Sequence, residues 1–171
     1  MDNNQAKTVI DVQTGEVEAG SGKVVLRSDG IGSCVVIAAF DTKAKIGAIA
    51  HVMLPGRAPK ESTPQKLRYA ANAIDEVIKK MSSLGAEDMC DVGFCLIGGG
   101  NVLKRADDKV SKDNIDSVVE ILSSKGMRVV AESLGGEKRR SATLNVETGC
   151  VSFSEGDDSE RVLWEARLTA I

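Results

Sequence analysis

Cys34 and His51 are the two residues of this chain whose types and spacing best suit covalent catalysis. Cys34 directly follows a glycine-rich loop that begins at Gly30, and His51 is the only histidine among the 171 residues. A cysteine sulfur attacks a carbonyl carbon as its thiolate, and a neighbouring imidazolium lowers the pKa of a thiol below its ordinary value of about 8.5. The pair therefore indicates a cysteine hydrolase, provided that the fold brings the two side chains together.

The segment that carries both residues is predicted to be a β-hairpin. Two apolar runs typical of buried strands, residues 34–40 and 46–54, flank a short polar turn. If the turn is centred between Thr42 and Lys43, Cys34 lies directly opposite His51, with Cβ atoms about 4.5–5.5 Å apart. A shift of one residue would instead place the two side chains on opposite faces of the sheet.

The loop before Cys34 favours the enzymatic interpretation over a structural one. Taken alone, a cysteine that opens an apolar strand is more often a small buried side chain, and a lone histidine on a strand is more often a surface or hydrogen-bonded core residue. Gly30, Gly32 and Ser33, however, permit a tight turn that exposes the sulfur and directs backbone N–H groups at an oxyanion. The conjunction of loop, cysteine and facing histidine predicts an active site.

Composition argues against several other classes of function. Lys and Arg number 22 against 25 Asp and Glu, and the two signs are interspersed, so we expect no nucleic-acid partner. The four cysteines, at positions 34, 90, 95 and 150, form no CxxC pair, and with one histidine they support neither a disulfide framework nor a structural zinc site. We therefore expect no metal and no cofactor.

The N-terminus is polar and lacks the basic and apolar regions of a secretory signal. The longest strongly apolar run, residues 34–40, is too short to cross a bilayer. We expect a cytoplasmic protein that does not insert into a membrane.

The remaining pattern predicts one α+β domain over residues 1–171, with residues 1–20 as a loose N-terminal segment. Amphipathic helices are expected from Pro64 to a stop at Gly85 and from near Ser111 or Asp113 to a stop at Gly126. Strand-like runs are expected at residues 23–26, 92–97, 128–131, 142–146, 151–153 and 161–168, the last at a sheet edge. Many strands and two helices favour packed mixed β-sheets in a sandwich-like arrangement, with both helices on the outside.

The residues around Cys34 and His51 resemble the signature of the CheD family. In that signature a GxGSC loop precedes an xxHxMLP strand, and this chain has Gly30-Ile-Gly-Ser-Cys34 followed by Gly47-Ala-Ile-Ala-His-Val-Met-Leu-Pro55 at the same spacing. The family's later landmarks follow in the same order, as Gly98-Gly99, Asn114, Gly135-Gly136 with Arg140, and Glu147-Thr148-Gly149. The resemblance covers roughly residues 23–153.

CheD proteins deamidate glutamines of methyl-accepting chemotaxis receptors to glutamates, often bind the phosphatase CheC, and are similar in fold to toxin-type cysteine deamidases. The resemblance therefore implies a protein-glutamine glutaminase that acts through a thioester of Cys34, with His51 as the base. It also implies an orienting hydroxyl six positions before the cysteine, here Ser28. An acyl-enzyme of this kind also forms from a glutamyl methyl ester, so receptor methylesterase activity is a secondary expectation. The oxyanion and substrate loop is expected to comprise Gly30, Gly32, Ser33, Gly98 and Gly99.

Two departures from the family's pattern leave alternatives open. Ser28 stands where threonine is usual, and a serine accepts a hydrogen bond equally well but is less constrained in its rotamer. Asp29 stands where an aliphatic residue is usual, and a carboxylate facing the site would raise the pKa of His51. The alternatives are a non-catalytic receptor-binding adaptor and a cysteine hydrolase of small amides or peptides.

A basic run, Lys138-Arg139-Arg140, lies near the end of the resemblance. Its first interpretation is a solvated turn, and the second is a contact for an acidic receptor surface.

Overall fold

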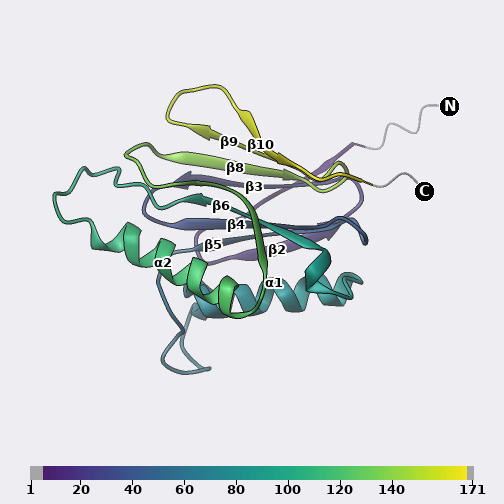
Figure 1. Cartoon of the computed structure of the whole chain (residues 1–171), viewed down its shortest axis with the longest axis horizontal. Helices are drawn as coiled ribbons and strands as arrows, with labels where there is room; N and C mark the ends of the chain where they lie inside the picture. The colour runs from purple at the N-terminus through teal and green to yellow at the C-terminus, as the bar shows by residue number, and fades with distance from the viewer. Residues whose placement is uncertain (1–5, 169–171) are drawn as a thin grey trace.

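The computed structural model describes residues 6–168 and confirms the α+β class, with two mixed five-stranded sheets packed together (Figure 1). One sheet has the order β1-β3-β8-β9-β10, formed by Thr8–Asp11, Val24–Ile31, Arg140–Asn145, Cys150–Glu155 and Arg161–Glu165. The other has the order β2-β5-β4-β6-β7, formed by Val17–Ser21, Ile46–Val52, Val35–Asp41, Val92–Gly98 and Arg128–Leu134. As expected, β10 lies at a sheet edge.

The layers follow from the alternation of side chains along the central strands. In β4, Val36, Ala38 and Phe40 face the other sheet and form the core between the two sheets. The alternate positions, such as Val35 and Ile37, face the helices and form a second core. Since every residue of β4 is buried on one face or the other, its sequence is apolar throughout.

Both predicted helices lie on the outside of the second sheet, as Figure 1 shows. Helix α1 spans Ala70–Leu84 and ends at Gly85, whose φ of 117° suits only glycine. It begins later than the sequence predicted, because the extended backbone of Tyr69 separates it from a short 3₁₀ turn at Lys66–Arg68. A second 3₁₀ turn, Met89–Asp91, precedes β6.

Helix α2 spans Lys109–Ser124, and the Asp108 carboxylate at its N-cap accepts a hydrogen bond from the Ser111 amide. Val118 and Leu122 are buried against the sheet, whereas Val119 is 40 % exposed. Among residues 6–168, no helix is long and apolar enough to span a membrane.

The prediction of a loose N-terminal segment is wrong for most of residues 6–20. Strand β1 pairs in parallel with β3, and β2 pairs antiparallel with β5, so this segment contributes one strand to each sheet. Residues 1–5 lie outside the described part of the chain. Strand β3 is also longer than expected, because a bulge between Ser28 and Ile31 accommodates Gly30, with a φ of 65°, within the strand.

Candidate active site

Cys34 lies one residue before β4, half-buried at the end of the glycine-rich loop. The backbone carbonyls of Gly32, Ser33 and Cys34 each accept a hydrogen bond from a residue elsewhere in the chain. Gly100 N donates to Gly32 O at 2.9 Å, Asn114 Nδ2 to Ser33 O at 3.0 Å, and Gly99 N to Cys34 O at 2.7 Å. The loop is therefore fixed by its backbone oxygens.

In a trans peptide the N–H points opposite to the preceding C=O. Because the carbonyls of Gly32 and Ser33 are bound on the α2 and β6 side, the amides of Ser33 and Cys34 point the other way. Within residues 6–168 neither amide donates to another residue, and the Cys34 amide points at its own sulfur. Two adjacent amides that bind no other residue, beside a sulfur, are a suitable arrangement for a developing oxyanion.

Gly98 and Gly99 support this loop from behind. A Cβ on Gly98 would lie 2.3 Å from the Cys34 carbonyl oxygen, so only glycine permits this close approach. The Gly99 amide is already bound to the same oxygen and has no hydrogen left for a substrate. These two glycines, expected in the oxyanion and substrate loop, hold Cys34 in place, whereas Gly30, Gly32 and Ser33 line the cavity beside it.

The predicted register of the hairpin is wrong by two residues. His51 pairs with Val36, and Cys34 is its diagonal neighbour on the same face. The turn is centred one residue later than expected, because the Asp41 carboxylate accepts hydrogen bonds from the Lys43 and Ala44 amides and Lys45 adopts a positive φ of 57°. Since side chains alternate, a shift of two preserves the face and lengthens the separation to that of a diagonal pair, about 7–8 Å between Cα atoms.

His51 is 2 % exposed and is held by a hydrogen-bonded chain from its ring to the N-terminal segment. Its Nδ1 lies 2.8 Å from the Ser28 hydroxyl, and that hydroxyl donates its single hydrogen to the Val12 carbonyl at 2.7 Å. The hydroxyl must therefore accept from Nδ1–H, which leaves the lone pair on Nε2. Nε2 is buried without a hydrogen-bond partner in the described chain, so no residue there occupies its lone pair.

The backbone of His51 is fixed by the same N-terminal segment. The Gly15 amide donates to the His51 carbonyl at 2.9 Å, and the His51 amide donates to the Glu16 carbonyl at 3.1 Å. Gly15, Glu16 and Val12 make these contacts through their backbone groups. Since any residue has such groups, no pattern of residue types predicted the contacts.

Burial determines the ionisation of both candidate catalytic groups. Desolvation lowers the pKa of His51 to about 4 and raises the pKa of the Cys34 thiol. This is opposite to the expectation that an imidazolium keeps the sulfur ionised. At neutral pH the site holds a neutral imidazole and a neutral thiol, and no hydrogen bond joins Nε2 to the sulfur in the described chain.

Asp29 does not face the imidazole. Its side chain is 64 % exposed and lies 3.7 Å from Arg27 Nε, on the outer face of β3. Accordingly, burial is the only cause of the shift in the pKa of His51.

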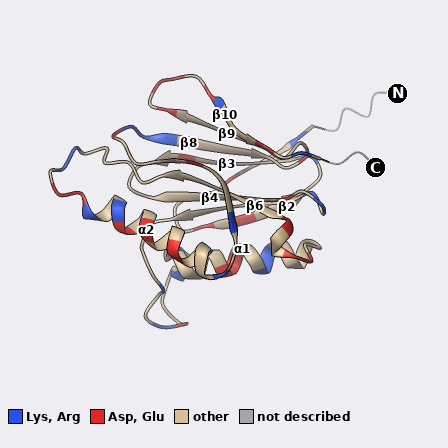
Figure 2. Cartoon of the chain, viewed as in Figure 1, with Lys and Arg blue, Asp and Glu red and all other residues tan. Residues whose placement is uncertain are grey.

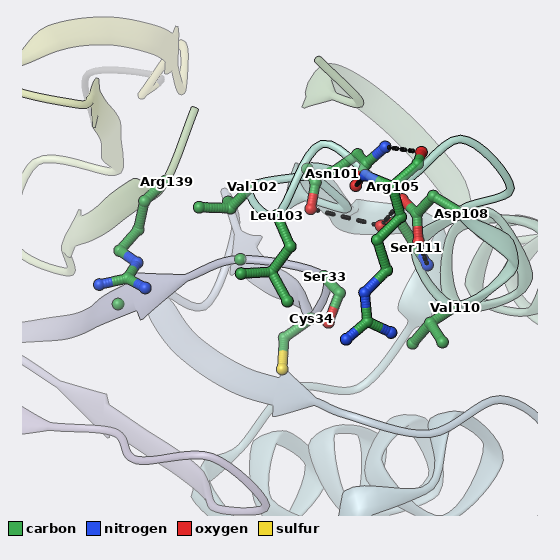
Figure 3. A pocket seen from close by; sticks show the side chains of 13 residues that line it. Ser33, Cys34, Asn101, Val102, Leu103, Arg105, Asp108, Val110, Ser111 and Arg139 are labelled. Carbon is green, nitrogen blue, oxygen red and sulfur yellow. Dashed lines mark hydrogen bonds between the residues drawn. The ribbon is translucent and has the colours of Figure 1, made fainter. Parts of the chain in front are cut away.

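Cys34 opens onto a cavity of about 400 Å³ (Figure 3). Its other walls come from the loop after Gly99 and the start of α2, including Val102, Leu103, Arg105 and Val110, and from Arg139. The cavity reaches the surface, so a side chain of another protein has access to the sulfur. Among residues 6–168, no three His, Cys, Asp or Glu side chains are grouped so that they would hold a metal ion.

Two buried polar residues complete the support of the site, and the sequence showed them only as landmarks. Asn114 Nδ2 donates to the carbonyls of Ser33 and Met53, both at 3.0 Å, and so links the cysteine loop to the end of the histidine strand. Arg140 donates to Gly98 O at 3.1 Å and pairs with Glu155 at 3.2 Å. The signal for Asn114 is an amide on the buried stripe of α2, one turn before Val118.

The family comparison and the sequence relatives agree on one family. The family described as "CheD chemotactic sensory transduction" matches residues 53–155. A Chlorobium luteolum protein named probable chemoreceptor glutamine deamidase CheD is 36 % identical over 152 residues, covering 89 % of this chain and 75 % of that protein. A Thermotoga maritima protein named chemoreceptor glutamine deamidase CheD is 32 % identical over 143 residues, covering 84 % and 88 %. Among solved structures, the Bacillus licheniformis hypothetical protein YfiH has a TM-score of 0.42 and 11 % identity, covering 80 % of this chain and 61 % of that protein.

Proposed function

Because the chain belongs to the CheD family, we propose that it is a protein-glutamine glutaminase that deamidates specific glutamines of methyl-accepting chemotaxis receptors. The observation that carries this proposal is the chain of hydrogen bonds from Val12 through Ser28 to His51. It leaves a free basic nitrogen on the same sheet face as a loop-mounted cysteine.

The first half of the reaction forms a thioester. As Cys34 Sγ attacks the carboxamide carbon, its proton passes to His51 Nε2, and the oxygen that becomes negative is bound by the amides of Ser33 and Cys34. The imidazolium then gives this proton to the departing nitrogen, which leaves as ammonia. The Ser28 oxygen accepts the Nδ1–H bond throughout and is therefore a positioning residue.

The second half hydrolyses the thioester. Nε2 takes a proton from water, the resulting hydroxide attacks the thioester carbon, and collapse releases glutamate while the sulfur regains the proton. The starting pair is neutral, so the proton moves during the attack, as it does in a serine hydrolase. The diagonal pair must approach within hydrogen-bond reach, and catalytic contacts are often long without substrate.

The family also supports the remaining parts of the proposal. Methyl-accepting receptors are the substrates, the phosphatase CheC is a second partner, and the protein works in the cytoplasm. A glutamyl methyl ester would enter the same cycle with methanol in place of ammonia, which gives a secondary methylesterase activity.

The test uses a purified receptor cytoplasmic fragment and mass spectrometry. Wild type should add about 1 Da for each glutamine converted to glutamate, and Cys34→Ala should add none. Cys150→Ala, which removes a half-buried thiol in β9, is the matched control and should act as wild type. No mass gain with wild type would favour the adaptor alternative, and equal gain with Cys34→Ala would refute Cys34 as the nucleophile. Equal turnover of short free peptides would favour the small-amide hydrolase.

A further inference from the structure

We propose that Arg105 and Arg139 make the cavity selective for glutamines that have acidic side chains on both sides. This inference rests on the proposed function, since it names the substrate chemistry of the same site. It would distinguish one receptor glutamine from another by the charges that surround each.

The three cations of the basic run near Cys34 have three different environments. Lys138 lies 3.2 Å from Asp158, and Arg140 is buried against Glu155 and the Gly98 carbonyl. Arg139 lines the cavity that contains Cys34, and in the described chain its guanidinium has no ion pair. Of the three basic residues that the sequence suggested as a contact for an acidic receptor surface, Arg139 is therefore the one available at the cavity.

Arg105 reaches the same cavity from the loop between β6 and α2. The Asn101 side chain braces this loop, because its Nδ2 donates to the Arg105 carbonyl at 2.7 Å and its Oδ1 accepts from the Arg105 amide at 3.0 Å. The guanidinium itself forms no ion pair within residues 6–168. In the view of Figure 3 the guanidinium groups of Arg105 and Arg139 lie on opposite sides of Cys34.

The acidic residues near these two cations are mostly engaged elsewhere. Asp108 caps α2 through Ser111, Glu137 lies 3.9 Å from Lys104, and Asp29 pairs with Arg27. Asp29 and Asp157 line a neighbouring hollow with Arg139, but neither forms an ion pair with it. Elsewhere the signs are mixed, as Figure 2 shows along α2, in a chain of net charge −3. Within residues 6–168, Arg105 and Arg139 are therefore two guanidinium groups without an ion pair that line the same cavity as Cys34.

The rest of the rim is apolar. Leu103 is 73 % exposed and Val110 is 50 % exposed, and in the view of Figure 3 Val102 lies between Leu103 and Arg139. A matching substrate is an amphipathic segment whose apolar side chains cover this rim while its carboxylates pair with the two guanidinium groups. Guanidinium groups bind carboxylates through two parallel hydrogen bonds, which fixes the segment and its glutamine over the sulfur.

The enzyme side of the test reverses these charges. Each of Arg105→Glu and Arg139→Glu should lower kcat/KM about 2- to 5-fold on acid-flanked glutamines, chiefly through KM, as expected for exposed ion pairs. The double variant should lose about 10-fold or more, since repulsion replaces both attractions. Arg128→Glu makes the same charge change at an exposed position at the start of β7, outside the cavity, and serves as the control.

The substrate side replaces the acidic neighbours of a mapped receptor glutamine with lysine. Wild type should then prefer the original fragment, and the double variant should prefer the lysine-flanked one. The same preference in both enzymes, or an equal loss in Arg128→Glu, would overturn the inference.

A binding measurement separates this inference from the proposed function. Cys34→Ala should bind the receptor fragment, and adding both Arg→Glu changes should weaken that binding about 10-fold. If wild type leaves the fragment unmodified, the deamidase proposal fails while this charge dependence still decides the inference. Equal binding with and without the arginines would overturn the inference and leave deamidation standing.

Discussion

The proposed nucleophile and the proposed base of this site are held by different kinds of structure. Cys34 is half-buried in a loop whose carbonyl oxygens are bound by Gly99, Gly100 and Asn114. His51 lies inside the sheet sandwich, with its ring oriented by Ser28 and its backbone bound to the N-terminal segment. The sulfur is presented to the surface by close backbone contacts, whereas the imidazole is kept neutral by burial.

This difference explains why the loop around Cys34 is easy to recognise in the sequence, whereas the contacts that hold His51 are not. Where two backbone segments lie as close as those of Gly98 and Cys34, only glycine fits, so the loop around Cys34 has a recognisable sequence pattern. Burial requires only apolar neighbours and a carbonyl in the right place, which many sequences supply. The most direct experiments therefore change one half while the other stays intact.

Replacing the base should have the largest effect. His51→Gln keeps an amide that can donate to Ser28 but removes the basic nitrogen, so the rate of glutamine conversion should fall about 10²- to 10⁴-fold. The measurement is the initial rate on the receptor fragment, with thermal unfolding to show that the variant folds. A loss below about 5-fold would mean that another group accepts the proton, and the two-part description of the site would fail.

Acid should destabilise the fold through the base region. The pKa of His51 is about 4 in the fold against 6.5 in the unfolded chain, so between these values the unfolded state binds more protons. The contribution of this group to the free energy of unfolding should thus fall as the pH drops from 6.5 to 4 and change little below 4. The total loss is about 3 kcal/mol. Urea unfolding across that range measures the loss, and most of the slope should vanish in His51→Gln.

The single histidine makes this prediction sharp. Nitrogen-15 spectra should show one imidazole with its proton on Nδ1 and a midpoint near 4. A midpoint at the ordinary value, or a proton on Nε2, would contradict the assigned hydrogen-bond chain.

Breaking the link between the two regions should have a smaller effect. Asn114→Ala removes a buried amide that donates to the carbonyls of Ser33 and Met53, which should cost about 2 kcal/mol of unfolding free energy and lower the activity. Asn72→Ala is the matched control, since that buried helix asparagine binds the Ala58 amide away from the cavity. It should lower stability without lowering kcat. Equal kinetic effects in the two variants would argue against positioning by Asn114.

The smallest change concerns the orienting hydroxyl. Ser28→Ala removes the acceptor of Nδ1–H and should slow conversion about 10-fold, because the neutral ring is no longer held in one tautomer. Ser28→Thr keeps the hydroxyl in a stiffer rotamer and should stay within about 3-fold of wild type. Rates on the receptor fragment compare the two, and a Thr variant as slow as the Ala variant would contradict the orienting role.

The sequence predicted the layers of the fold because alternation and helical periodicity record which faces are buried. It missed β1 and β2, since both are short and β1 is mostly exposed, and their partners are distant in sequence. It placed the hairpin turn one residue too early because the Asp41 cap is a contact of one side chain rather than a pattern.

In the site, residue types were easier to predict than their electrostatics. Cys34, His51 and Ser28 were selected by motif, and the structure brings Ser28 and His51 into contact. The direction of both pKa shifts was missed, because it depends on how deeply each group is buried. Arg140 was seen as part of a charged turn, and only the fold shows it buried.

The length of the four-residue connection between β4 and β5 decides which face of the sheet His51 occupies. Inserting or deleting one residue there would move the imidazole to the layer filled by the helices, far from any thiol. A change of two would slide it along the sandwich interior by one diagonal step. An engineered change to this connection should therefore add or remove an even number of residues. In a homologue, an odd insertion or deletion here should place the histidine on the wrong face of the sheet for the proposed reaction.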